Sequence, residues 1–303
     1  MTAERARREP GARRVREALL GYALVLPALA VFGVFVFYPF LENFRTALCE
    51  SPPYPGLPSH YVGLHQVGQV LTSSSFLQSL GSTLLLVVLV VPAGLLAGLA
   101  LAVAAHRRLR AMALYRLVFS STAVTSVAVS ALVFGTLMNP VVGFLPWLGI
   151  RPTPPLLESS TWALPAIALI VVWQFLGLAF IVMSAGLSAI PDDVLEAARV
   201  DGASDTRVFW RVTVPLLSPT IFFAGVVATI YAFQTFGVIN VLIAPDNAAF
   251  EHVNVLVYNI VDTIEVNHTP GQAAVLSIVL FLLTLGVTLL QLRLIERRVH
   301  YAS

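Results

Sequence analysis

The sequence predicts an all-α integral membrane protein that crosses the bilayer six times. Of its 303 residues, 57% are hydrophobic and only 11% are charged, and the mean hydropathy is +0.84. An average soluble domain has about 25% charged residues, so a soluble fold cannot bury this much apolar surface. The apolar residues also form long uncharged runs, and a helix needs about 20 such residues to cross about 30 Å of hydrocarbon.

Six segments meet this length requirement, and none of them contains a charged residue. They are residues 19–41, 80–105, 117–138, 162–190, 212–245 and 272–292. The first is too long for a signal peptide, whose apolar core has about 7 to 15 residues, and no A-x-A cleavage site follows it. The fifth is 34 residues long, which allows a span with a turn on either side. We therefore expect residues 19–292 to form a six-helix transmembrane domain.

The distribution of arginine predicts the orientation of this domain. All 18 basic residues are Arg, and 16 of them lie in the N-terminal tail, residues 106–116, residues 191–211 and the C-terminal tail. Only Arg45 and Arg151 lie in the alternate loops. Because Lys and Arg are enriched on the cytoplasmic side of membrane proteins, both tails, residues 1–18 and 293–303, are expected in the cytoplasm.

Composition also disfavours several classes of function. The formal net charge is only +2 and the Arg clusters flank apolar runs, so a membrane protein is favoured and no nucleic-acid partner is expected. Cys49 is the only cysteine, which excludes an internal disulfide and a Cys-rich metal site. The spans lack the acidic, His and Arg residues that proton relays and intramembrane metalloproteases use. Any pumping must therefore draw its energy from another polypeptide.

Residues 191–215 form the most informative loop, PDDVLEAARVDGASDTRVFWRVTVP. Pro191 fits the first position of a short helix, and Gly202 fits the residue after its end. Ser204 can then cap a second short helix, in which Val208, Phe209 and Val212 share one face. Two short helices joined at a glycine form a compact knob on the Arg-rich side. The alternative interpretation of this segment is an ordinary amphipathic loop.

This loop resembles the EAA loop of importer-type ABC permeases. The pattern is Glu-Ala-Ala, three residues, Gly, nine residues, Ile, one residue and Leu-Pro. Glu196-Ala197-Ala198, Gly202 and Pro215 match it, and Val212 and Val214 replace the usual Ile and Leu. The resemblance implies the type I ABC importer permease fold and a loop that docks in a cleft of an ATPase subunit. It also implies that Glu196, Ala197, Ala198, Asp201 and Gly202 couple this chain to the ATPase and that no residue is catalytic.

The same resemblance implies a set of partners and a location. Those partners are a second permease subunit, two ATPase subunits, an extracytoplasmic solute-binding protein and membrane lipid, at the bacterial inner (cytoplasmic) membrane. The chain has no Gly-x4-Gly-Lys-Ser/Thr phosphate loop, so its own cofactor is expected to be none, with ATP and Mg bound by the partner ATPase. No metal ligands are expected.

Three further segments narrow the resemblance to the maltose-type, carbohydrate-uptake class. Residues 61–64 look like a segment common in sugar-type permeases of this superfamily. Residues 231–239 and 288–301 look most like the first permease subunit of glycerol-3-phosphate and glycerophosphodiester importers, whereas residues 244–247 replace the usual Gly-Gly-Pro. The implied substrate is glycerol-3-phosphate or a glycerophosphodiester such as glycerophosphocholine. The alternatives are a disaccharide or oligosaccharide permease of the same superfamily and, from a different class, a stand-alone secondary carrier or a membrane-embedded enzyme.

Polar residues at membrane depth are the candidates for the substrate path. They are Trp173, Gln174, Tyr231, Gln234 and Thr235. The spacing of Tyr231, Gln234 and Thr235 predicts one helical stripe, although buried Gln and Thr also serve as packing bonds between membrane helices. No span contains an Arg that could neutralise a phosphate. The partner permease, helix N-termini or hydroxyl groups must then bind that charge.

Overall fold

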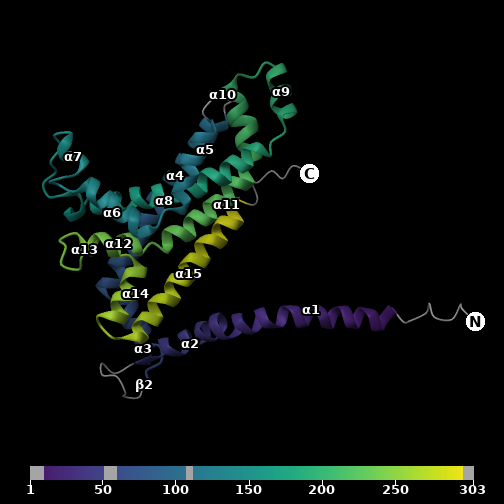
Figure 1. Ribbon diagram of the computed structural model, residues 1–303. Coiled ribbons are helices and arrows are strands. Elements are labelled where there is room, and N and C mark those ends of the chain that lie inside the picture. The colour runs from purple at the N-terminus through teal and green to yellow at the C-terminus, as the bar shows by residue number, and fades with distance from the viewer. Residues whose placement is uncertain (1–9, 51–59, 107–111, 296–303) are drawn as a thin grey trace, which may run out of the picture.

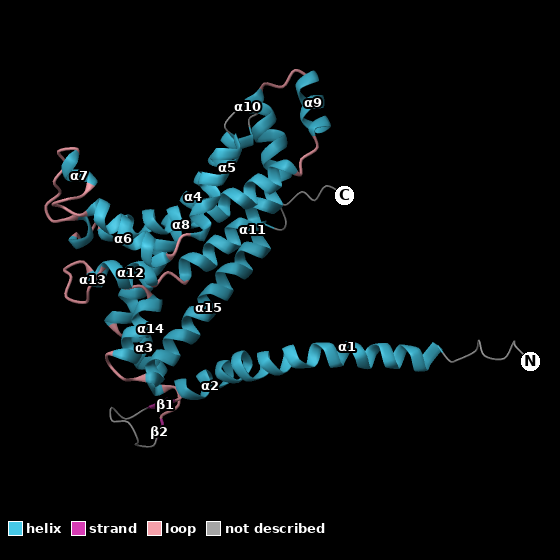
Figure 2. Cartoon of the chain, in the orientation of Figure 1, coloured by secondary structure: helices cyan, strands magenta, loops and turns pink. Residues whose placement is uncertain are grey.

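The computed structural model describes residues 10–50, 60–106 and 112–295. Most of the described residues are helical (Figure 2), and the one sheet among them is a short antiparallel pair, β1 (Cys49–Glu50) with β2 (His60–Tyr61). The outer parts of the expected tails, residues 1–9 and 296–303, lie outside the described residues. The end of the 288–301 match lies there too. The first helix begins at Pro10, inside the expected tail 1–18.

The helices of the first half are α1 (Pro10–Phe32), α2 (Tyr38–Ala47), α3 (His65–Thr72), α4 (Ser74–His106), α5 (Met112–Ser121), α6 (Val127–Met138) and α7 (Phe144–Trp147). Those of the second half are α8 (Ala163–Ser188), α9 (Asp192–Val200), α10 (Asp205–Val208), α11 (Val214–Phe233), α12 (Gly237–Leu242), α13 (Phe250–Val253), α14 (Leu256–Glu265) and α15 (Pro270–Ile295). Short π-helical segments, Gly33–Phe37 and Phe209–Thr213, join α1 to α2 and α10 to α11 without a break.

Helix length and composition agree with the prediction of six spans when one bent helix pair is counted as a single span. Five continuous helices of the described chain can cross a membrane, namely Glu17–Ala47, Ser74–His106, Ala163–Ser188, Asp205–Phe233 and Pro270–Arg293. The remaining span consists of two helical pieces, Leu114–Val124 and Val127–Met138, bent by 105°. The expectation of one continuous third helix over 117–138 is therefore wrong.

The third span breaks at a cluster of hydroxyl residues. Thr125 and Ser126 are extended, with ψ angles of 130° and 141°. Just before them, Ser121 Oγ donates to the Val118 carbonyl at 2.7 Å, and Thr122 Oγ1 donates to a carbonyl three residues back at 2.9 Å. Ser and Thr side chains that bond to the local backbone compete with a regular helix. Hydropathy alone does not detect such a break because Ser and Thr leave the segment uncharged.

The core of the molecule is the packing of α8 against α4 and α11. One buried cluster includes Leu86 of α4, Ile170 of α8 and Ile239 of α12. A second buried cluster joins α4, α8 and α11 near α9 and α10. At the opposite end, Asn259 Nδ2 donates to Ser79 Oγ at 3.0 Å, and the Leu256 N–H donates to Thr83 Oγ1 at 2.8 Å. These bonds attach α14 to the beginning of α4.

The first span lies apart from this core. Figure 1 shows α1 extending away from the other helices, whereas α2 meets α15, with the rings of Phe40 and Phe281 5.2 Å apart. None of the 18 most apolar residues of this span is buried in the described chain. Apolar residues such as Leu24 and Phe35 are 81% and 74% exposed. In a membrane this surface must contact lipid or another protein.

The broken third span depends on close contact with α8 at Gly177. A Cβ at this position would lie 2.5 Å from Thr122 Oγ1 and also against the backbone nitrogen of Ala123. A side chain therefore cannot be added without moving the backbone of the break. The absence of a side chain at Gly177 therefore allows the third span to pack closely against α8.

We expect Gly177→Ala to lower the stability of the purified protein by about 1 to 3 kcal/mol, as overpacking does. The matched control is Gly81→Ala on α4, where an added Cβ meets nothing within 4 Å. This control should be neutral or slightly stabilising, since Ala is favoured over Gly in helices. Thermal unfolding in detergent measures both variants. Equal melting temperatures for the two would contradict the packing described here.

Candidate functional site

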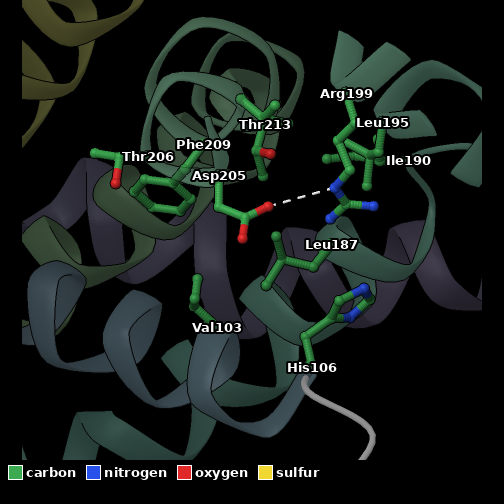
Figure 3. Close-up of a pocket in the computed structure, with 11 residues that line it drawn as sticks. Val103, His106, Leu187, Ile190, Leu195, Arg199, Asp205, Thr206, Phe209 and Thr213 are labelled. Carbon is green, nitrogen blue, oxygen red and sulfur yellow. Dashed lines mark hydrogen bonds and ion pairs between the residues drawn. The ribbon is translucent and has the colours of Figure 1, made fainter. Parts of the chain in front are cut away.

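Two regions of the described chain contain all of the predicted site residues except Trp173, and the first is the loop formed by α9 and α10. It lies at one end of the bundle, far from β2 and α3 in Figure 1. A cavity of about 670 Å³ separates the loop from the ends of α4 and α8. Figure 3 shows His106 of α4 and Leu187 of α8 on one side of this cavity, with Arg199 and Asp205 on the other.

The turn after α9 is a Schellman motif built on Gly202. The Gly202 N–H donates to the Arg199 carbonyl at 3.0 Å, and the Ala203 N–H donates to the Ala198 carbonyl at 3.1 Å. This pair of bonds requires a left-handed residue after the helix, and Gly202 has a φ of +83°. The predicted role of Gly202 as the residue after the helix end is confirmed. Its conformation strains any residue that has a Cβ.

An ion pair closes the turn between the two helices. Arg199 Nε lies 3.4 Å from Asp205 Oδ1, with the side chains 55% and 90% exposed. Such an exposed pair contributes only about 0 to 1 kcal/mol. The Schellman motif therefore fixes the turn, and the ion pair adds little to its stability.

The EAA residues lie on α9 as a largely exposed surface. Glu196, Ala197 and Asp201 are exposed, whereas Ala198 is half-buried. Two apolar side chains, Val194 and Val200, are 42% and 86% exposed. The sequence interpretation missed these two valines, although an apolar residue among the charges of a short helix is a detectable signal. Small, apolar and acidic groups thus form one face that is free for a partner.

Three local details of this loop differ from expectation. Pro191 is the N-cap of α9 rather than its first helical residue. Ser204 occupies the N-cap of α10 with no side-chain capping bond. The second short helix is not separate, because residues Asp205–Phe233 are continuously helical. The loop is therefore attached rigidly to the fifth span.

The second region is a cavity of about 130 Å³ within the bundle. It brings together four of the five predicted path residues, Gln174, Tyr231, Gln234 and Thr235. Tyr231 Oη donates to Gln174 Oε1 at 3.0 Å. Gln174 is only 7% exposed, and its Nε2 has no hydrogen-bond partner in the described chain. The Gln174 side chain thus lines the cavity, while its unpartnered nitrogen is itself buried.

The predicted helical stripe is wrong in its geometry. The helix ends at Phe233, so Gln234 is its C-cap and Thr235 follows it in a turn. The three side chains still line one cavity because the chain turns around it. Trp173 does not line this cavity; its ring packs edge-on against Phe134, with centroids 5.3 Å apart.

Two interruptions of the spans meet at this cavity: the break at Thr125 and Ser126 in the third span, and the end of α11 at Phe233. Val127, the first residue of α6, lines it beside Gly237, the first residue of α12. The sequence interpretation missed Val127 because it treated the third span as continuous; the Ser and Thr residues around 120–126 were the available signal. Broken helices around a polar cavity are typical of transporter binding sites.

The chemistry of this cavity is hydrogen bonding without a charged group. Its lining contains amides, a phenol and a hydroxyl, with apolar residues around them. Across the described residues, no three His, Cys, Asp or Glu side chains lie close enough to hold a metal ion. Such a lining can orient a polar solute.

Broken spans around a neutral polar cavity, joined to an exposed helical loop, define a multi-pass membrane transport protein. The chain belongs to the family described as binding-protein-dependent transport system inner membrane component, whose model matches residues 91–301. It is therefore a permease of an ABC importer, as the loop indicates. The alternative of a stand-alone carrier is not supported, because the family consists of components of binding-protein-dependent systems.

Curated relatives extend this assignment over most of the chain. The sn-glycerol-3-phosphate transport system permease protein UgpA of Agrobacterium fabrum is 34% identical over 287 residues, covering 93% of this chain and 97% of the relative. The protein of the same name from Yersinia pestis is 32% identical, covering 93% and 96%. Both the family and the branch identified from the sequence are confirmed.

Solved structures share the fold. A chain of a bacterial ABC transporter involved in the import of the acidic polysaccharide alginate has a TM-score of 0.82 at 22% identity, covering 95% of this chain and 99% of that chain. A chain of the alginate transporter in complex with an alginate pentasaccharide-bound periplasmic protein has a TM-score of 0.79 at 21% identity, covering 94% and 96%. The type I ABC importer permease fold is thus confirmed.

We expect Gly202→Val to leave the spans folded but to weaken attachment of the ATPase, because a β-branched residue cannot readily adopt a φ of +83°. The matched control is Gly149→Val, since Gly149 has a φ of +80° in a different loop. Co-purification of the ATPase measures the effect. Normal ATPase binding and transport by the Gly202 variant would show that the turn is not the attachment point.

We expect Gln234→Ala to impair transport without unfolding the protein. The Gln234 side chain is exposed and makes no hydrogen bond to a described residue, so its removal breaks no packing bond. Loss of one substrate bond typically costs about 0.5 to 1.5 kcal/mol, which predicts a several-fold higher half-saturating substrate concentration. ATP hydrolysis without substrate should change little. A lower yield of complex with normal transport per complex would instead identify Gln234 as a packing residue.

Proposed function

We propose that this chain is one of two permease subunits in the bacterial cytoplasmic membrane that together form the path for glycerol-3-phosphate or a glycerophosphodiester. A solute-binding protein delivers the substrate, and two ATPase subunits drive its import. The observation that carries the proposal is the match to glycerol-3-phosphate permeases over 93% of the chain. The neutral donors of the intramembrane cavity suit a polar solute that must also be released.

The unpacked first span supports a second permease. A span with none of its most apolar residues buried in the described chain gains packing when a partner contacts it. The intramembrane cavity also has only about 130 Å³, below the range of about 300 to 1,000 Å³ of typical ligand pockets. A facing subunit would supply the remaining wall.

The exposed face of α9 supports an external ATPase. Glu196, Ala197 and Val200 present an acidic, a small and an apolar group without covering by this chain. Glu196 can bond to a partner arginine or backbone amide, and alanines permit close approach. ATP and Mg would be bound by that subunit, and this chain would hold no cofactor.

The position of the loop and the distribution of Arg support the proposed orientation. The ends of α4 and α8 meet α10 at one cavity, so these elements share one side of the membrane. The excess of Arg on the loops of this side supports its assignment to the cytoplasm. Both tails would then lie in the cytoplasm as well.

The orientation predicts the accessibility of single cysteines in a Cys49→Ser background. In cells that lack the ATPase subunit, a cysteine at Asn267 should react with an impermeant thiol reagent while the cells are intact, whereas one at Val200 should react only after the membrane is opened. Both positions are exposed in this chain, so the difference reports the side of the membrane. Labelling of position 200 in intact cells would reverse the orientation.

A sugar permease is the second candidate, because the described lining of the cavity has no charged side chain. Uptake by the whole complex in proteoliposomes separates the two candidates. Labelled glycerol-3-phosphate, glycerophosphocholine and maltose are compared in the presence of the binding protein and ATP. We expect ATP-dependent uptake of a phosphorylated solute and co-purification of a second permease and an ATPase. Uptake of maltose alone would replace the proposed substrate, and purification of this chain alone would refute the assembly.

A further inference from the structure

We propose that residues 140–150 insert into the interfacial region of the lipid bilayer and anchor α6 there. This segment follows the end of α6, contains α7 and leads towards α8. The proposed function assigns no role to it. The inference depends neither on the substrate nor on which side of the membrane is the cytoplasm.

The segment is apolar throughout and largely exposed. None of its residues, PVVGFLPWLGI, has a charged side chain. Val141, Val142 and Trp147 are 80%, 74% and 78% exposed, and Phe144 and Ile150 are about half exposed. Neighbouring side chains are exposed together, so the segment is uncovered on several sides. Lipid can surround a loop in this way, whereas a protein partner covers one face.

The backbone of the segment satisfies much of its own hydrogen-bonding capacity. Asn139 Oδ1 accepts the N–H groups of Val141 and Val142 at 2.9 and 3.1 Å. The Asn139 carbonyl accepts that of Gly143 at 3.0 Å, and residues 148–150 donate to carbonyls within the segment. Its two prolines have no N–H group. Unpaired backbone groups are costly away from water, so this loop is suited to the edge of the hydrocarbon layer.

The position of the segment is continuous with the surface of a span. The two pieces of the third span are bent by 105°, so α6 runs nearly across the first piece. Figure 1 shows α6 and α7 projecting from the side of the bundle. Val129, Leu132 and Val133 of α6 are also more than half exposed, and no charged residue separates them from the loop. The side of a membrane-spanning bundle meets lipid, so the loop extends a lipid-facing surface.

The ends of the segment match the boundary between lipid and water. Arg151 follows it directly and is exposed, and it is one of only two Arg residues in the alternate loops. The Phe144 and Trp147 rings stack with their centroids 5.8 Å apart. Trp is enriched at membrane interfaces, and an Arg side chain can extend from an apolar surface to the head groups.

The composition disfavours the solute-binding protein as the occupant. That protein is soluble and would dissociate in each transport cycle. Interfaces of this kind have a polar rim and about one hydrogen bond per 100 to 200 Å². Apart from the Trp147 indole N–H, the side chains of residues 140–150 can make no hydrogen bond.

The anchor acts on a helix that begins at the intramembrane cavity. Val127, the first residue of α6, lines that cavity. The helix has 12 residues, or about 18 Å at about 1.5 Å per residue, and the loop follows its other end. A loop held in the lipid therefore fixes the far end of α6 and, through it, one wall of the cavity.

The test measures the surroundings of the loop in the assembled complex in proteoliposomes. A spin label is attached at Trp147→Cys or at Val142→Cys in a Cys49→Ser background. Its collisions with molecular oxygen, which concentrates in lipid, are compared with its collisions with a nickel chelate, which stays in water on both sides of the membrane. The matched control is Ser160→Cys, an exposed position in the same connection between α6 and α8. Co-purification of the partner subunits shows that each variant is assembled.

We expect the ratio of oxygen to nickel collisions to be at least fivefold higher at positions 142 and 147 than at position 160, because interfacial side chains are shielded from water. Two labelled positions are used because lipid reaches several sides of the loop. The ratio should not change when the solute-binding protein is added.

Three results would overturn the inference. A ratio at both positions equal to that at position 160 means that the loop lies in water. Protection of either position from both reagents means that the second permease covers the loop. A fall in nickel collisions only after the binding protein is added identifies that protein as the occupant. None of these results requires transport, so a failure of the proposed substrate is distinguished from a failure of the anchor.

Discussion

The packing of α8 is the interaction on which the rest of the structure depends. In its most apolar window 61% of the residues are buried, more than in any other candidate span of the described chain. This helix supplies Gln174 to the intramembrane cavity and Leu187 to the cavity beneath the loop. Its Gly177 allows the broken third span to pack closely against it. A displacement of α8 would therefore change both candidate regions at once.

The two breaks in the spans lie where a membrane protein can accommodate them. Unpaired backbone groups are costly in lipid, so irregular backbone is found only inside the protein or beside a polar cavity. At the first break the Thr125 N–H still reaches the Thr122 carbonyl at 3.2 Å, and at the second the Thr235 N–H reaches the Ala232 carbonyl at 3.3 Å. The first N–H groups of α6 and of α12 have no partner within their helices, and both helices begin at the cavity. The free backbone donors of both breaks thus lie beside the cavity that the proposed function assigns to the solute.

The sequence predicted the features that composition and spacing determine. The uncharged runs predicted the spans because the thickness of the hydrocarbon layer sets the length of a span. Gly202 predicted the turn because few other residues adopt a positive φ. The break at Ser126 and the end of α11 at Phe233 were not predicted. A window of hydropathy averages over both, and the deciding contacts come from α8, which is distant in sequence. Gln174 and Tyr231 were identified as path residues, but their mutual bond required the fold.

The continuous helix from Asp205 to Phe233 connects the two candidate regions physically. It has 29 residues, or about 44 Å at about 1.5 Å per residue. Its first turn lies in the loop formed by α9 and α10, and Tyr231 near its other end donates a hydrogen bond to Gln174. A rigid helix converts a small tilt at one end into a larger displacement at the other. Under the proposed coupling, movement of α9 by the ATPase would separate Tyr231 from Gln174 and change the donors that face the solute.

The π-helical segment Phe209–Thr213 is the one irregular stretch in this helix, and such segments often occur at functional sites. Its position between loop and membrane makes it the place where bending, rather than tilting, would uncouple the two regions.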